Sequence, residues 1–173
     1  MSKILIAYFS RSGNNYVSGN IVNLPEGNTS VVAHKIQRLV GAELFEIKPV
    51  KDYPADYDEA TRVAQEESDA NSRPEIVKPL PNILKYDKII LGYPCWWDTM
   101  PMAVMTFLEN FDFSGKKVLP FCTHEGSGMG RSESDLRKLC KGAEFSKGLP
   151  IKGSTASSSD SKVKSWLKEN GLL

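Results

Sequence analysis

The chain of 173 residues contains little cysteine and histidine, two residue types that often act as nucleophiles, general bases and metal ligands. It has three cysteines and two histidines. Cys95, Cys122 and Cys140 are odd in number and lack the spacing of a zinc site, so neither a metal centre nor a disulfide framework is predicted. No nucleophilic triad can be assembled around His34 or His124 from the sequence, and a lone histidine is more often structural than catalytic. We therefore expect no metal ion and no catalytic residue.

Long apolar segments are missing too, since no run approaches the roughly 18 residues that a membrane span needs. Residues 1–3 lead straight into a strand-like stretch and not into the apolar region of a signal peptide. We expect a cytoplasmic protein without membrane association. The formal net charge is +1 and no Lys/Arg run with interleaved aromatic residues is present, so nucleic-acid binding is not expected.

What the sequence does contain is an ordinary globular composition, with 40% hydrophobic and 25% charged residues, and a length that suits one domain over residues 1–173. Apolar runs of strand length occur at residues 4–9, 44–47, 88–91 and 118–122, with a weaker candidate at 145–151. Stretches with helical spacing of apolar residues alternate with them. This alternation predicts an α/β fold with a doubly wound parallel sheet and helices on both faces.

In such sheets ligands bind beyond the carboxyl ends of the strands, so the loop after each strand is a candidate site. The first of these loops begins with Ser10, Arg11, Ser12, Gly13 and Asn14. Amides and hydroxyl groups in such a run can converge on an anion, although an ordinary strand-to-helix turn uses the same residue types. The next helix begins only at about residue 28, and so long a connection favours a functional loop.

The start of that helix adds to the candidate anion site. Asn28 or Thr29 is expected to cap the helix, whose free amides and positive dipole end favour a phosphate. The sequence has neither G-x-G-x-x-G nor G-x-x-x-x-G-K-[ST], which are the fingerprints of dinucleotide and nucleoside-triphosphate binding. A mononucleotide is therefore favoured.

The loop after the third strand carries two adjacent tryptophans, Trp96 and Trp97. Neighbouring residues of an extended loop point apart, so either could stack on a planar ligand, and either could equally pack over the helix that follows. Pro94 and Pro101 restrict the backbone of the loop, and Thr99 is expected to cap the next helix. The sequence therefore predicts a preorganised loop with an aromatic side chain available to a ligand.

The loop after the fourth strand is rich in glycine, which allows backbone to approach a ligand closely. Its residues 123–130 read Thr-His-Glu-Gly-Ser-Gly-Met-Gly. They lead into Ser132 to Asp135, a segment with the pattern of a capping box. A glycine-rich turn before a helix is common, so this loop alone is a weak signal.

Three motifs in this order make the chain resemble the flavodoxin family. Residues 8–14 followed by 27–29 look like its phosphate motif with residues 16–27 as an insertion, and the Gly-Asn pair occurs on both sides of that insertion. Residues 93–97 resemble the Tyr-Pro-X-Trp-Trp loop of a bacterial subgroup that lines the isoalloxazine, and residues 123–127 resemble its third flavin loop. The resemblance implies a flavodoxin-like five-stranded sheet of order 2-1-3-4-5 with bound FMN.

The site residues that the resemblance implies come from all three loops. The phosphate loop and helix start contribute Ser10, Arg11, Ser12, Gly13, Asn14, Asn28 and Thr29. The second and third loops contribute Pro94, Cys95, Trp96, Trp97, Thr123, Glu125, Gly126 and Ser127, with the amides of Gly126 and Ser127 expected to serve the pyrimidine edge of the flavin. Asp98 stands where the subgroup usually has glycine. Aspartate tolerates a positive φ better than most residues, and its negative charge near the ring is expected to disfavour an anionic reduced flavin.

The same resemblance implies a function in electron transfer, in which FMN exchanges electrons with transient redox protein partners and no catalytic acid or base is needed. Such carriers are usually strongly acidic, whereas this chain is near neutral. An FMN-dependent NAD(P)H reductase of quinones or azo compounds is the alternative. A flavodoxin-like interaction domain without cofactor is less expected, because the hydroxyl-rich loop and the paired tryptophans are intact.

Overall fold

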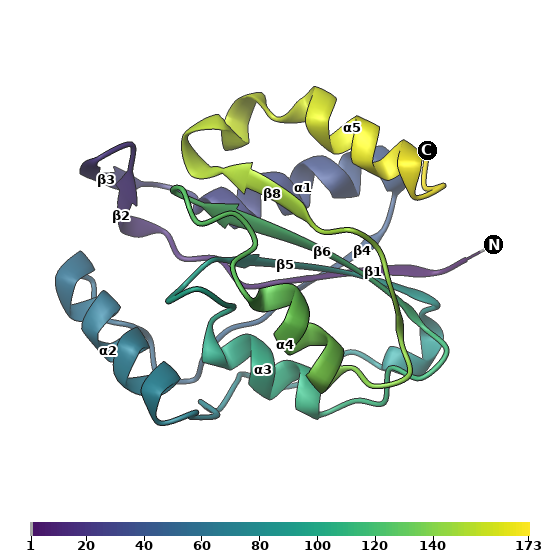
Figure 1. Cartoon of the computed structure of the whole chain (residues 1–173), viewed down its shortest axis with the longest axis horizontal. Coiled ribbons are helices and arrows are strands. Elements are labelled where there is room, and N and C mark those ends of the chain that lie inside the picture. The colour runs from purple at the N-terminus through teal and green to yellow at the C-terminus, as the bar shows by residue number, and fades with distance from the viewer. Residues whose placement is uncertain (1) are drawn as a thin grey trace.

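The computed structural model describes residues 2–173 and has a central, mostly buried sheet with helices on both faces (Figure 1). The strands are β1 Ile4–Tyr8, β2 Gly13–Val17, β3 Asn20–Leu24, β4 Glu43–Glu46, β5 Lys88–Pro94, β6 Lys117–His124, β7 Glu144–Phe145 and β8 Leu149–Lys152. The α-helices are α1 Asn28–Val40, α2 Tyr57–Asp69, α3 Met102–Glu109, α4 Ser132–Leu139 and α5 Asp160–Glu169. Two 3₁₀ helices, η1 Ile83–Lys85 and η2 Gly153–Ser158, complete the elements.

The central sheet is parallel and confirms the predicted fold class and strand order. Its order is β4-β1-β5-β6, followed by β7 and β8, which both pair with β6. The strand count differs from the predicted five because the last strand is broken into two pieces. At the break, which includes Lys147, the carbonyl of Lys147 accepts a hydrogen bond from the indole Nε1 of Trp166 at 2.9 Å. The fifth position of the sheet therefore has two short strands in place of one.

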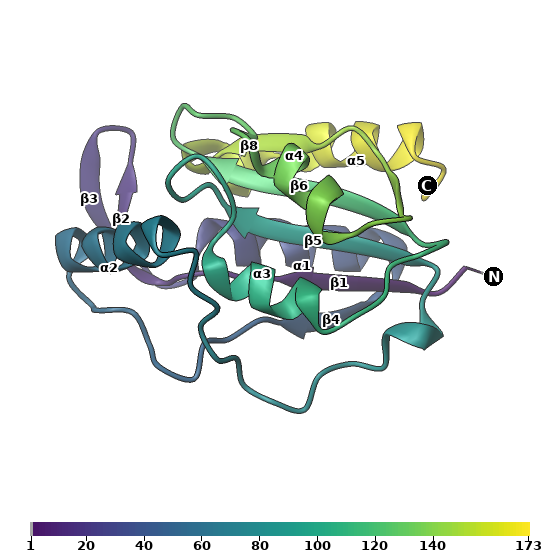
Figure 2. The same ribbon diagram turned by 60° about the horizontal axis from the view of Figure 1, so that its bottom comes forward.

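Successive residues of each central strand are buried on opposite faces of the sheet, which explains why these strands read as continuous apolar runs. Leu5 and Ala7 of β1 pack on the side of α3 and α4, whereas Ile6 and Tyr8 pack on the side of α1 and α5. Figure 2 shows the two helical layers on either side of the sheet. The central strands are thus covered on both faces, and their carboxyl ends remain for a site.

A β-hairpin formed by β2 and β3 was not predicted. It is antiparallel, lies outside the central sheet and reverses direction at Ser18 and Gly19, whose φ angles are 49° and 88°. In Figure 1 it projects from the body of the molecule at the end where α2 lies. The insertion expected at residues 16–27 is therefore an ordered hairpin that begins at Gly13, between β1 and α1.

The helix caps differ in part from the predictions. Asp56 caps α2, and its side chain accepts a hydrogen bond from the amide of Glu59. The cap of α1, in contrast, is Gly27, so Asn28 and Thr29 lie in the first turn of the helix.

The two later helices also begin without the expected side-chain caps. Pro101 is the cap of α3, and the hydroxyl of Thr99 donates instead to Asp135 of α4 at 2.6 Å. Arg131 is the cap of α4, and the hydroxyl of Ser132 donates to the carbonyl of Met129 at 2.6 Å instead of forming a capping box. The Thr99–Asp135 bond fastens the tryptophan loop to α4.

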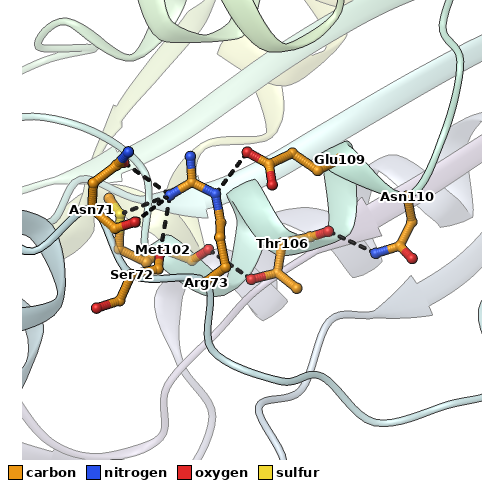
Figure 3. Close-up of polar contacts among 7 residues, drawn as sticks. All are labelled: Asn71, Ser72, Arg73, Met102, Thr106, Glu109 and Asn110. Atoms are coloured by element: carbon orange, nitrogen blue, oxygen red, sulfur yellow. Dashed lines mark hydrogen bonds and ion pairs between the residues drawn. The ribbon is translucent and has the colours of Figure 1, made fainter.

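The segment after α2 is held against α3 by Arg73, as Figure 3 shows. Its Nε donates to Glu109 at 2.7 Å, and its Nη1 donates to oxygen atoms of Asn71 and Ser72. These bonds fix the end of α2, whose first turns line the site described below. Within residues 2–173, no helix is long and apolar enough to cross a membrane.

Candidate functional site

Two adjoining cavities lie at the carboxyl ends of β1, β5 and β6. The first, called the helix cavity here, has a volume of about 140 Å³ and is next to the start of α1. It is lined by Ser10, Arg11, Asn15, Tyr16, Asn28, Thr29, Tyr57, Pro94, Cys95, Thr123, His124, Glu125 and Gly153. The second, the tryptophan cavity, has a volume of about 320 Å³. It is lined by Arg11, Asn15, Tyr57, Ala60, Thr61, Ala64, Cys95, Trp96 and Trp97.

Ten of the fifteen predicted site residues thus line one or both cavities. Ser12, Gly13 and Asn14 do not, because the chain turns outward into the hairpin after Arg11, and they line a separate cavity together with Lys48. Gly126 and Ser127 are exposed and line neither of the two adjoining cavities. Of the two Gly-Asn pairs, only the one at the start of α1 places its asparagine in the helix cavity, beside Ser10.

The start of α1 meets the first loop closely because Gly27 has no side chain. A Cβ at Gly27 would lie 2.2 Å from Oγ of Ser10 and 2.6 Å from the carbonyl oxygen of Arg11. The same Ser10 Oγ accepts a hydrogen bond from the amide of Ser30 at 3.1 Å, and the hydroxyls of Thr29 and Thr123 are 2.7 Å apart. Hydroxyl and amide groups therefore gather at a helix N-terminus whose first turn contains no acidic residue, an arrangement that suits an anion.

Arg11 brings a positive charge to the wall between the two cavities. Its guanidinium donates to the backbone carbonyls of Asn14, of Pro54 at 2.8 Å and of Ala55 at 3.1 Å. Burial lowers the pKa of Arg11, but an arginine guanidinium keeps its proton in proteins. The charge is held in place by the loop before α2 and favours a negatively charged ligand.

The two tryptophans have different surroundings, which the sequence could not decide. Trp96 is half-buried and meets Phe9 and Tyr53 edge to face, with ring centroids 5.1 and 5.0 Å apart. Trp97 is 44% exposed, and its Nε1 donates to the carbonyl of Thr61 in α2 at 3.0 Å. Trp96 therefore supports the loop by packing against Phe9 and Tyr53. Trp97 has a partly exposed ring that lines the tryptophan cavity.

Trp97 and Asp98 form the centre of a tight reverse turn. Their φ angles are 50° and 70°, and Trp96 and Thr99 exchange backbone hydrogen bonds of 2.8 and 3.2 Å across the turn. Asp98 thus adopts the left-handed conformation that aspartate tolerates, and the positive φ extends to Trp97. The carbonyl of Asp98 accepts a further bond from the amide of Arg131 at 2.7 Å, so the turn is fixed to the start of α4.

Sequence reasoning missed several lining residues that distant elements bring to the site. Tyr16 of the hairpin stacks on Tyr57 of α2, with ring centroids 6.2 Å apart and an angle of 25° between the planes. Asn15 and Gly153 also line the helix cavity. Tyr57 lines both cavities, and no motif in the sequence pointed to it. These residues close the sides of the site that the three loops leave open.

The third loop reaches the site through Glu125 more than through its glycines. The ring of His124 accepts a hydrogen bond from the amide of Gly126 at 2.9 Å, so this amide, predicted to serve the flavin, is already engaged. Burial, with a contribution from Lys162, lowers the pKa of His124, so the ring is neutral at physiological pH. Within residues 2–173, no group of three or more metal-ligating side chains could hold a metal ion.

Cys95 has an acidic thiol at the boundary of both cavities. A hydrogen bond from the Cys122 thiol lowers the pKa of Cys95 to about 7, assisted by Ser127 and opposed by burial. The pKa of Cys122 is raised by the same hydrogen bond and by burial, and burial raises the pKa of Cys140 to about 12. Cys95 is thus the thiol with the largest thiolate fraction at neutral pH.

We expect iodoacetamide to alkylate Cys95 faster than the other two cysteines, with a rate that rises through pH 7, because the thiolate is the nucleophile. Mass spectrometry of peptides quenched at successive times measures this rate, and the variant Cys95→Ser should lose the fast phase. A midpoint at or above the ordinary thiol value of about 8.5 would contradict the assignment.

A sequence profile of the flavodoxin family matches residues 3–170. A solved structure of a candidate flavoprotein from Bacteroides eggerthii is 30% identical, with 98% of each chain covered and a TM-score of 0.78. No curated protein sequence matches the chain significantly.

Two further solved structures are similar at the level of the fold. A flavoprotein from Lactobacillus acidophilus in complex with FMN is 24% identical over 96% of this chain and 99% of its own, with a TM-score of 0.66. Oxidised flavodoxin 2 from Bacillus cereus is 23% identical over 97% of this chain and 99% of its own, with a TM-score of 0.54.

Proposed function

The chain belongs to the flavodoxin family, and on this premise we propose that it binds FMN and transfers electrons between redox partners. The observation that carries the proposal is the pairing of an anion site at the start of α1 with an aromatic cavity beside it. FMN has the matching parts, since a phosphate and a planar tricyclic ring are joined by a polyhydroxy chain.

The residues fit these parts one by one. Ser10, Asn28 and Thr29 supply neutral donors for the phosphate at the start of α1, and Arg11 adds a positive charge. The helix cavity leads into the tryptophan cavity, because Arg11, Asn15, Tyr57 and Cys95 line both. Trp97 and Tyr57 line the second cavity with aromatic rings suited to stacking on a flavin. The donor set therefore suits a flavin mononucleotide.

The arrangement of these residues favours a carrier. FMN supplies the redox chemistry when bound, and the protein has to hold it, exclude water from part of it and leave one edge open. Trp97 and Tyr16, both 44% exposed, stand at the rim of the site, where a partner could approach the ring. The two flanking aromatic groups can exclude water from part of the ring. Transient redox proteins are the partners we propose.

We expect titration with FMN to give one saturable binding site per chain, seen as quenching of flavin fluorescence and of tryptophan emission. Stepwise reduction of the complex at controlled potential should then show two separated one-electron steps, as an electron carrier requires. Rapid bleaching by NADPH alone, with turnover of an added quinone, would favour the reductase instead. Absence of saturable binding would contradict the FMN site itself.

A further inference from the structure

The carboxylate of Glu125 is fixed at one oxygen and unpaired at the other. Its Oε2 accepts a hydrogen bond from the amide of Ser18 at 3.1 Å, which ties the third loop to the tip of the hairpin. Its Oε1 is buried and has no hydrogen-bond partner among residues 2–173. The carboxylate is therefore held in one place with one acceptor left unsatisfied.

The surroundings of this oxygen are polar and part of the helix cavity. A Cβ at Gly153 would lie 2.4 Å from Oε1 of Glu125 and 2.6 Å from Nδ2 of Asn28, so both groups lie next to Gly153 on the side where a side chain would stand. Thr29 and Thr123 line the cavity close to them. The absence of a side chain at Gly153 leaves the carboxylate room at the start of α1.

Burying a carboxylate oxygen without a hydrogen-bond partner costs free energy, because the oxygen has lost its bonds to water. A ligand that donates a hydrogen bond to this oxygen removes that cost. The parts of FMN differ in this respect. The phosphate is an acceptor with negative charge at neutral pH and would be repelled, whereas each hydroxyl of the ribityl chain can donate. The position of Glu125 beside the phosphate donors, in the cavity that leads to the tryptophans, matches the chain between phosphate and ring.

Resting on the proposed function, we propose that Glu125 recognises the ribityl chain of the flavin, with Oε1 accepting a hydrogen bond from a ribityl hydroxyl. The residue then determines specificity for flavins that carry a polyhydroxy chain. The bond from Ser18 orients the carboxylate before the ligand arrives, so little side-chain entropy is lost on binding. The carboxylate becomes fully paired only in the complex.

The test compares three flavins on the whole chain: FMN, riboflavin, which lacks the phosphate, and lumiflavin, which lacks the chain as well. Their dissociation constants are measured by flavin fluorescence for the native protein and for Glu125→Gln, which keeps one oxygen for the Ser18 amide. Glu26→Gln is the matched control, because this half-exposed carboxylate just before α1 accepts from Ser30 and lies outside both cavities.

We expect Glu125→Gln to weaken riboflavin binding by about tenfold to a hundredfold, the loss typical of a hydrogen bond to a charged group. The affinity for FMN should fall by a smaller factor, because removing the charge of Glu125 also relieves its repulsion of the phosphate. Lumiflavin binding should stay within about twofold, since the ring does not contact the carboxylate. Glu26→Gln should leave riboflavin binding unchanged.

Other outcomes separate the two proposals. Unchanged riboflavin binding with tighter FMN binding would mean that Glu125 only repels phosphate, and equal losses for riboflavin and lumiflavin would place its contact on the ring; either result overturns the inference and leaves FMN binding intact. Failure of the native protein to bind FMN overturns both. If thermal unfolding shows that Glu125→Gln does not fold, Glu125→Asp, which withdraws the carboxylate, must show the same ribityl-specific loss.

Discussion

Replacing Gly27 with alanine is expected to weaken FMN binding by about a hundredfold or more, as the loss of two hydrogen bonds to a charged group would. The new Cβ would lie 2.2 Å from Oγ of Ser10 and 2.6 Å from a backbone oxygen of Arg11, too close for either to stay in place. The first loop must then move away from α1, and Ser10 leaves the donors of Asn28 and Thr29. Titration with FMN measures the loss.

The same substitution should lower the free energy of unfolding by about 1–3 kcal/mol, as overpacking typically does. The matched control is Gly41→Ala at the other end of α1, where a Cβ has open space but φ is 66°. It should cost about 1 kcal/mol of stability through backbone strain and leave FMN binding unchanged. If Gly27→Ala binds FMN like the native protein, the contact between loop and helix does not form the phosphate site.

The central sheet could be predicted from the sequence because its strands are covered on both faces and therefore read as apolar runs. Strand order needed the resemblance to flavodoxins, since apolar runs do not say which strands are neighbours. The hairpin was missed for the opposite reason: β3 is largely exposed, so its sequence shows no burial pattern. The one local signal was Ser18-Gly19, a dipeptide typical of tight turns, between two runs of five residues.

The candidate site could be predicted where it consists of loops that follow strands directly. Ser10, Thr123 and Cys95 reach the cavities because the carboxyl ends of parallel strands meet at one edge. The outward turn after Arg11 could not be foreseen, so the sequence alone does not distinguish the two Gly-Asn pairs as phosphate ligands. Tyr16 and Gly153 come from elements far apart in the chain, and only the folded topology brings them together.

The two tryptophans, which the sequence left equivalent, should respond to substitution in opposite ways. Trp96→Ala is expected to lower the free energy of unfolding by about 2–4 kcal/mol, because it empties a half-buried position against Phe9 and Tyr53. Trp97→Ala should cost about 1 kcal/mol or less, since an exposed ring and one hydrogen bond to Thr61 are lost. Urea unfolding without cofactor measures both values.

The effects on FMN affinity should have the opposite order, with substitution of Trp97 costing more than substitution of Trp96, after the differences in stability between the variants are taken into account. Trp97→Ala is expected to weaken binding by about tenfold or more, the loss typical of one stacking aromatic ring, and Trp97→Phe should restore most of it. Trp96→Phe, which keeps an aromatic ring against Tyr53, should bind FMN within about threefold of the native protein, because Trp96 acts by supporting the loop. Equal losses for Trp97→Phe and Trp97→Ala would show that the indole hydrogen bond to Thr61, which fixes the loop to α2, matters more than the ring face, and Trp97 would then be a positioning residue.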